Sequence, residues 1–129
     1  MRLAVISAAD SVLIVEVPET YEEMLQGLAG RPSLADGRGM LFDMGATGLW
    51  PFSTRQMLFS LDLLMLRDDG AVLEIARDVP PRFDPAVGSS AYSWVLELPG
   101  GWSRRRRLMP GHFVRPCAPG WHSLRELRR

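Results

Sequence analysis

The segment Leu61-Asp62-Leu63-Leu64-Met65-Leu66, followed closely by Asp68-Asp69-Gly70, gives the most direct indication of the fold of this 129-residue chain. The first run is apolar except for Asp62, which is typical of a strand covered on both faces. Asp68-Asp69-Gly70 predicts a hairpin turn, because glycine accepts the positive φ angle that such a turn needs. The chain is therefore expected to return as a second strand over Ala71–Val79.

A third strand is predicted over Tyr92–Leu98, where side chains alternate between two faces. Tyr92, Trp94, Leu96 and Leu98 are expected on one face, and Ser93, Val95 and Glu97 on the other. Other extended segments are expected at Leu3–Ser7, Val12–Val17, Met40–Phe42 and Phe52–Phe59, with a loop over Gly45–Pro51.

An amphipathic helix is predicted over about Tyr21–Ala29. Thr20 and Glu23 form a capping-box pattern, and Gly30 supplies a stop signal. Apolar residues recur at helical spacing, so the helix is expected to lay one apolar stripe on the core. These residues are Tyr21, Met24, Leu25 and Leu28. A second, short helix is expected near residues 102–108.

Short strands with one early helix and turn-rich connections predict a mainly β protein. The expected form is a jelly-roll-like β-sandwich or a partly closed barrel. The length suits one domain, which we place at residues 1–114. Residues 115–129 form a basic C-terminal extension, either packed on that domain or trailing from it.

The composition is that of a globular chain, with 47% hydrophobic and 23% charged residues. No apolar run reaches the ~20 residues that a membrane span requires. We interpret the first residues as a strand rather than a secretion signal, because Asp10 interrupts the apolar stretch. Cys117 is the single cysteine, which fits a reducing compartment. A cytoplasmic protein is therefore expected.

Charge is unevenly distributed along the chain. Residues 1–98 hold seven arginines and fourteen acidic residues, whereas residues 99–129 hold eight arginines and one glutamate. The densest basic patch is Arg104, Arg105, Arg106 and Arg107. Such a patch is compatible with nucleic acid or an anionic surface, but no nucleic-acid-binding motif accompanies it. The same arginines could instead bridge the acidic part within the fold or in a homodimer.

Asp62 is the carboxylate whose position most needs an explanation. Burying it unpaired in an apolar strand is costly, so it must reach solvent, a backbone donor or a cation such as Arg31 or Arg55. Two interpretations stay open. Asp62 is either a structural ion pair or turn clamp, or a ligand-binding or acid–base group.

A series of short motifs occurs in a definite order over about residues 12–114. They are Val15-Glu16-Val17, Thr20–Glu23, Gln26-Gly27-Leu28, Gly30-Arg31, Ser33-Leu34, Gly39–Phe42, Leu61-Asp62, Gly70–Val72, Glu74-Ile75, Tyr92, Val95–Pro99, Gly101-Trp102 and Pro110-Gly111. Taken together, the series resembles the domain-of-unknown-function 192 family, also called uncharacterised protein family 0127. The resemblance implies a jelly-roll-like fold with the early helix packed against it, and it implies no established activity.

The chain departs from that family at one place. Members usually carry a Trp-Met-Lys-Asn-Thr-like stretch before a Pro-Leu-Asp strand. The corresponding positions here read Ser53-Thr54-Arg55-Gln56-Met57, and Ser60 replaces the proline. If that stretch lines a family ligand site, this chain binds a different ligand or none.

No catalytic set, metal site or cofactor is predicted. His112, Cys117 and His122 lack the close pairing of zinc ligands, and no nucleophile elbow or phosphate-binding glycine loop occurs. The leading hypothesis is a non-catalytic module that binds a small molecule or a polymer of unknown identity. The enzyme alternative is a small hydrolase or isomerase that uses Asp62 with Arg55. The expected cleft residues are Arg31, Met40, Phe42, Trp50, Arg55, Gln56 and Asp62.

Overall fold

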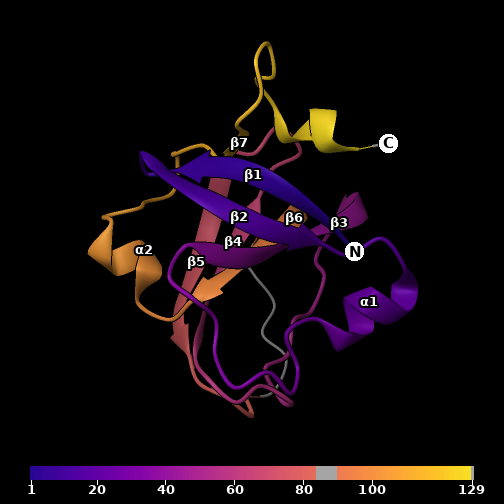
Figure 1. The fold of residues 1–129 in the computed structure, drawn as a ribbon, viewed down its shortest axis with the longest axis vertical. Coiled ribbons are helices and arrows are strands. Elements are labelled where there is room, and N and C mark those ends of the chain that lie inside the picture. The colour runs from indigo at the N-terminus through magenta and orange to yellow at the C-terminus, as the bar shows by residue number, and fades with distance from the viewer. Residues whose placement is uncertain (84–89, 129) are drawn as a thin grey trace.

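The protein is built on one seven-stranded sheet, seen in a computed structural model that describes residues 1–83 and 90–128. The strand order is β5-β4-β6-β3-β2-β1-β7. The strands are β1 (Arg2–Ala8), β2 (Ser11–Val17), β3 (Arg38–Gly48), β4 (Leu61–Leu66), β5 (Val72–Val79), β6 (Tyr92–Pro99) and β7 (Arg115–Pro116). The sheet curls into a half-barrel (Figure 1). The mainly β fold is therefore confirmed, in its partly closed barrel form.

Strand β4 lies between β5 and β6 and is buried along its whole length, as predicted for a strand covered on both faces. The predicted hairpin turn joins it to β5. Gly70 in that turn has a φ of +100°, and a Cβ atom there would lie 2.2 Å from the carbonyl oxygen of Val114. Only glycine therefore fits this turn.

The two faces of the central strands support separate apolar clusters. Trp94, Leu96 and Leu98 of β6 contribute to the larger cluster, whereas Val95 contributes to the smaller one on the opposite face. The predicted alternation therefore holds for these residues. It is wrong for Tyr92, which joins the smaller cluster. Tyr92 pairs with Gly48, beyond the irregularity that follows Asp43 in β3.

The predicted loop over Gly45–Pro51 is partly wrong, because β3 continues to Gly48 through an irregularity after Asp43. The predicted strand over Phe52–Phe59 is also wrong. Thr54 explains this, since its carbonyl oxygen accepts a hydrogen bond from the Met57 backbone N–H at 3.0 Å and turns the chain.

Helix α1 (Tyr21–Gln26) begins as predicted but ends earlier. The side chain of Thr20 accepts a hydrogen bond from the backbone of Glu23, and the Glu23 carboxylate accepts one from the backbone of Thr20, which completes the capping box. Gly27 ends the helix at a φ of +49°. The predicted apolar stripe is partly wrong. Leu28 and Met24 pack on the smaller cluster, but Tyr21 and Leu25 are 75% and 66% exposed. The short helix leaves a gap between itself and the sheet.

Two other short helices complete the fold, α2 (Trp102–Arg105) and η1 (Leu124–Leu127). Helix α2 is shorter than expected, since the chain leaves it at Arg106 and Arg107 has a φ of +53°. Within the residues that the structure describes, no helix has the length and apolar character of a membrane span.

The C-terminal segment lies against the sheet. Strand β7 pairs with β1, and Leu124 and Leu127 belong to the larger cluster. Arg128 donates hydrogen bonds to Asp43 at 3.1 and 3.2 Å and also pairs with Asp68, while its guanidinium stacks 4.6 Å from the Trp94 ring centre. The chain after residue 114 is thus integrated into the larger cluster.

Asp62 joins β4 to the start of α2. Its fully buried carboxylate accepts hydrogen bonds from the backbone N–H groups of Asp78 (2.9 Å), Gly101 (3.1 Å) and Ser103 (2.8 Å). The Ser103 hydroxyl donates a fourth at 2.6 Å. These four donors solvate the carboxylate in place of water, so Asp62 is a turn clamp.

Asp62→Ala is expected to lower the free energy of unfolding by about 3 kcal/mol or more, because the substitution leaves several donors without an acceptor. Urea denaturation at neutral pH measures this loss. Glu22→Ala, which removes an exposed carboxylate from α1, is the matched control and should change stability by about 0.5 kcal/mol or less. Equal effects of the two substitutions would contradict the clamp.

Candidate functional site

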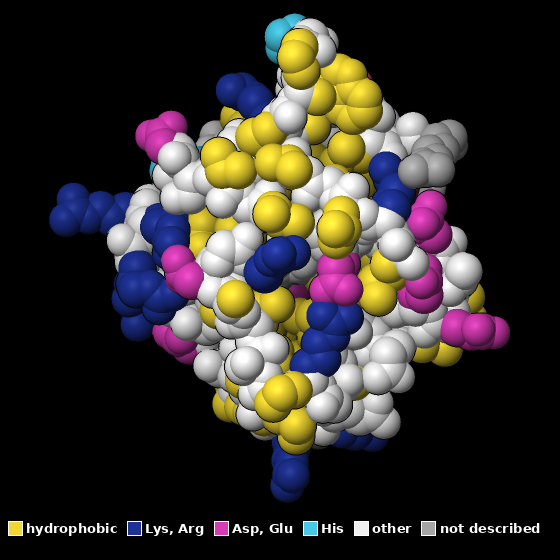
Figure 2. All heavy atoms as spheres, in the orientation of Figure 1, with side chains coloured by type: hydrophobic (Ala, Val, Ile, Leu, Met, Phe, Trp, Pro, Cys, Tyr) yellow, Lys and Arg dark blue, Asp and Glu magenta, His cyan; other side chains and the backbone are white. Residues whose placement is uncertain are grey.

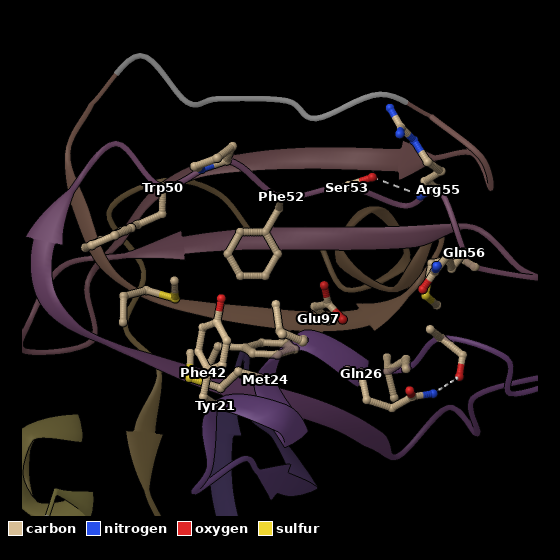
Figure 3. A pocket seen from close by; sticks show the side chains of 17 residues that line it. Tyr21, Met24, Gln26, Phe42, Trp50, Phe52, Ser53, Arg55, Gln56 and Glu97 are labelled. Carbon is tan, nitrogen blue, oxygen red and sulfur yellow. Dashed lines mark hydrogen bonds between the residues drawn. The ribbon is translucent and has the colours of Figure 1, made fainter.

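The gap between α1 and the sheet forms a pocket of about 680 Å³ (Figure 3). Its walls are α1 with the turn after it, β3 and the segment from Trp50 to Met57, and Glu97 comes from β6. The lining residues are Tyr21, Met24, Leu25, Gln26, Gly27, Leu28, Ala29, Phe42, Met44, Trp50, Pro51, Phe52, Ser53, Arg55, Gln56, Met57 and Glu97.

Aromatic side chains form part of the lining of this pocket. Phe42 of β3 and Phe52 pack edge to face, with ring centres 5.3 Å apart and planes at 76°. Trp50 is held by a 2.9 Å hydrogen bond from its indole N–H to the carbonyl oxygen of Ala46. The aromatic walls are therefore fixed by packing and hydrogen bonding before any ligand arrives.

The wall opposite α1 is fixed by Thr54. Its buried hydroxyl donates to the carbonyl oxygen of Pro80 at 2.6 Å and accepts from the Phe83 backbone N–H at 3.1 Å. The carbonyl oxygen of Gln56 accepts from the Gly30 backbone N–H at 3.3 Å, which ties this wall to the turn after α1. Both sides of the pocket are thus linked to each other and to the sheet.

Glu97 lies deep in the pocket, among apolar side chains (Figure 3). Met40 of β3 and Leu63 of β4 are its direct cross-strand neighbours, so they share its face of the sheet. The side chain is only 5% exposed, and no hydrogen bond or ion pair joins its carboxylate to another residue of the described chain. Burial raises the pKa of Glu97 to about 8.

Four of the seven expected cleft residues lie around the pocket, namely Phe42, Trp50, Arg55 and Gln56. The other three lie elsewhere. Met40 is buried beneath the pocket, beside Glu97. Arg31 pairs with Glu16 through hydrogen bonds of 2.5 and 3.0 Å, which hold the pKa of Glu16 below its usual range. Asp62 is clamped under α2 and does not line the pocket.

Asp62 and Arg55 do not form the catalytic pair that the enzyme alternative required. The Asp62 carboxylate is fully buried, and the Arg55 side chain is exposed at the pocket rim. Among the described residues there is also no group of three or more His, Cys, Asp or Glu side chains that could hold a metal ion. Within residues 1–83 and 90–128, the acid that lines this pocket is Glu97.

Arginines of the C-terminal third pair with acids from earlier in the chain. Asp36 accepts hydrogen bonds from Arg105 at 3.0 Å and Arg106 at 2.5 Å, and these hold the pKa of Asp36 below its usual range. Arg104 lies 3.5 Å from Asp78. Basic and acidic side chains accordingly lie next to one another on the face shown in Figure 2. These arginines thus bridge to acidic residues within the fold, which is one of the alternatives given in the sequence analysis.

The site residue that the sequence analysis did not select is Glu97. The alternation of side chains along the predicted strand placed Glu97 on the face opposite that of Trp94, and the structure agrees. A glutamate beside Ser93 on that face is equally typical of a solvated strand face. The available signal was its position between apolar neighbours; the missing information was that α1 and residues 50–57 cover this face.

The raised pKa of Glu97 makes stability depend on pH. The folded value is about 8 and the ordinary value is 4.5, so between these values the folded state holds a proton that the unfolded state lacks. This stabilisation is complete below about pH 4.5 and is lost as the pH rises through about 8. The free energy of unfolding should fall by up to about 1.4 kcal/mol per pH unit between about pH 5 and 8.

Urea denaturation across that range, compared with the neutral isostere Glu97→Gln, checks this expectation. The variant should lack this slope, whereas the exposed control Glu22→Gln should retain it. The same slope in Glu97→Gln and in the unsubstituted protein would show that Glu97 is not the group responsible.

Comparison with known proteins places the chain in a family. The model of DUF192, described as Uncharacterized ACR, matches residues 4–116. A candidate transcription regulator from Sinorhizobium meliloti 1021 is 27% identical with a TM-score of 0.79, covering 88% of this chain and 91% of that one. A protein of unknown function from Novosphingobium aromaticivorans DSM 12444 is 28% identical with a TM-score of 0.78, covering 87% and 81%. No curated protein matches the chain. The family match spans most of the sequence, and the chain belongs to the DUF192 family.

Proposed function

We propose that the protein is a non-catalytic binding module whose small-molecule ligand occupies the pocket between α1 and the sheet. The observation that carries this proposal is the pocket itself, which has a volume of about 680 Å³, aromatic walls and a buried carboxylate. Ligand sites are typically concave, mostly apolar and of roughly 300–1,000 Å³, with a few polar groups that orient the ligand.

The lining supports binding rather than catalysis. A hydrolase or isomerase needs a nucleophile, or an acid and a base in reach of one substrate. Glu97 is a single acid with no such partner beside it among the described residues, since Asp62 is used as a turn clamp. The fixed walls made by Phe42, Phe52 and Thr54 supply instead the preorganisation that binding requires.

A neutral aromatic probe, 2-(1-naphthyl)ethanol, is expected to bind with 1:1 stoichiometry and to shift the backbone amide resonances of the pocket residues. Ala29→Trp is the blocking variant, because Ala29 lines the pocket and a bulky side chain there fills it. We expect at least a tenfold loss of affinity, equivalent to about 1.4 kcal/mol. Titration followed by ¹H–¹⁵N correlation spectra measures both quantities.

Val12→Trp is the matched control for this experiment. Val12 is 65% exposed on β2 and does not line the pocket, so the same added side chain should leave probe binding unchanged. Binding that persists in Ala29→Trp, or resonance shifts that fall outside the pocket, would refute the proposed site.

Nucleic-acid binding through the arginine-rich third is the second candidate, favoured only by the description of the Sinorhizobium relative. In this chain Arg104, Arg105 and Arg106 pair with acidic side chains of their own molecule. We therefore expect weak binding to a 20-base-pair DNA duplex in fluorescence anisotropy, with little change as salt increases. Tight binding with a steep salt dependence, which reports several phosphate contacts, would instead support the nucleic-acid role.

A further inference from the structure

The pocket has a mostly apolar lining that includes one carboxylate, that of Glu97, beside the neutral polar side chains of Gln26, Ser53 and Gln56. Among the residues that the structure describes, Glu97 and Arg55 are the charged residues in its lining. Arg55 is exposed at the rim, and Figure 3 shows its guanidinium directed away from Glu97. The other ionisable side chain is Tyr21 of α1, which is 75% exposed. The lining residues from β3 are apolar, and β4 contributes none. The electrostatic character of the interior is therefore set by Glu97.

We infer that the ligand is an amphipathic amine, whose apolar body lies among the aromatic walls and whose protonated nitrogen hydrogen-bonds to Glu97. The inference rests on the proposed function and specifies the chemical class of its ligand. Two features of the structure carry it. Glu97 is only 5% exposed and has no hydrogen-bond or ion-pair partner in the described chain, and the side chains of Phe42, Trp50 and Phe52 line the same pocket (Figure 3).

A cation fits these features better than an anion or a neutral group. The Glu97 carboxylate lacks the hydrogen-bond donors that solvate Asp62, so its ionised form is costly until a ligand supplies a donor or a positive charge. A hydrogen bond between an ammonium group and a carboxylate is about twice as strong as one between neutral groups. Aromatic faces add attraction for a cation, whereas an anionic group would meet the like charge of ionised Glu97.

Binding of such an amine is coupled to proton release. With the pocket empty, Glu97 holds a proton near neutral pH, because burial raises its pKa to about 8. The arriving ammonium group favours the ionised carboxylate, so the carboxyl proton passes to the solvent while the amine keeps its own. Each bound amine therefore releases close to one proton below about pH 8 and fewer above it.

Three naphthyl compounds of nearly equal shape test the inference by isothermal titration calorimetry on the full chain. They are 2-(1-naphthyl)ethylamine, which is cationic, 2-(1-naphthyl)ethanol, which is neutral, and 1-naphthylacetic acid, which is anionic. Near pH 8.5 we expect the amine to bind at least tenfold more tightly than the alcohol, and the acid more weakly than the alcohol.

Glu97→Gln should reduce the preference for the amine over the alcohol to about threefold or less, because it keeps the side-chain shape and removes the charge. Glu22→Gln, an exposed control on α1, should keep the full preference. An amine that binds no better than the alcohol, or a preference that survives in Glu97→Gln, would overturn the inference. The proposed function would still stand if the alcohol bound in the pocket and Ala29→Trp blocked it.

A measurement on the unsubstituted protein gives an independent readout. The affinity for the amine should rise by close to tenfold per pH unit between about pH 6 and 8 and then level off, whereas the affinity for the alcohol should not rise. Titrations near pH 6.5 in buffers of different ionisation enthalpy should show about one proton released per amine. A flat profile with no proton release contradicts the role of Glu97 even if the variant fails to fold.

Discussion

The central strands of this protein are apolar on both faces, and each face must be covered by other parts of the chain. Strand β4 is buried at all six positions, and its side chains divide between two clusters on opposite faces of the sheet. The larger face is sealed by α2, by the segment that contains Val114, and by η1. The smaller face receives Leu28 and Met57 from the segments on either side of the pocket. Such coverage excludes water from the apolar surface that stabilises the fold.

The coverage of the smaller face is incomplete, and the pocket is the result. Helix α1 has only six residues, so it spans little of the sheet before Gly27 turns the chain. The carboxylate in the remaining space destabilises the protein when ionised, since nothing in the described chain compensates its burial. Titratable groups whose pKa is strongly shifted by burial are frequent at binding and catalytic sites. Glu97 therefore affects both the stability of the fold and the chemistry of the pocket.

Local signals predicted much of the fold. The apolar run of β4, the turn at Gly70 and the capping box at Thr20 depend on interactions between near neighbours, so the sequence contained them. The strand predicted over Phe52–Phe59 failed because the chain turns between Thr54 and Met57, and distant partners at Pro80 and Phe83 hold the Thr54 side chain there. Site prediction divided in the same way. The pocket lining includes four expected residues, Phe42, Trp50, Arg55 and Gln56. Asp62 was assigned to the cleft wrongly. Its four hydrogen-bond donors come from β5 and the α2 region, which are distant in sequence and could not be identified from it.

The joining of the two ends of the chain has a consequence for biosynthesis. The side chain of Arg2 donates a hydrogen bond to the carbonyl oxygen of Leu127, and Ile6 shares one cluster with Leu124. Arg2 and Leu127 are 125 residues apart in sequence, so the ribosome synthesises one long before the other. The first hairpin must therefore wait, with one apolar face uncovered, until residues 124–128 have emerged. Contacts so far apart in sequence also favour slow folding, and apolar surface that is exposed during that time is prone to aggregation.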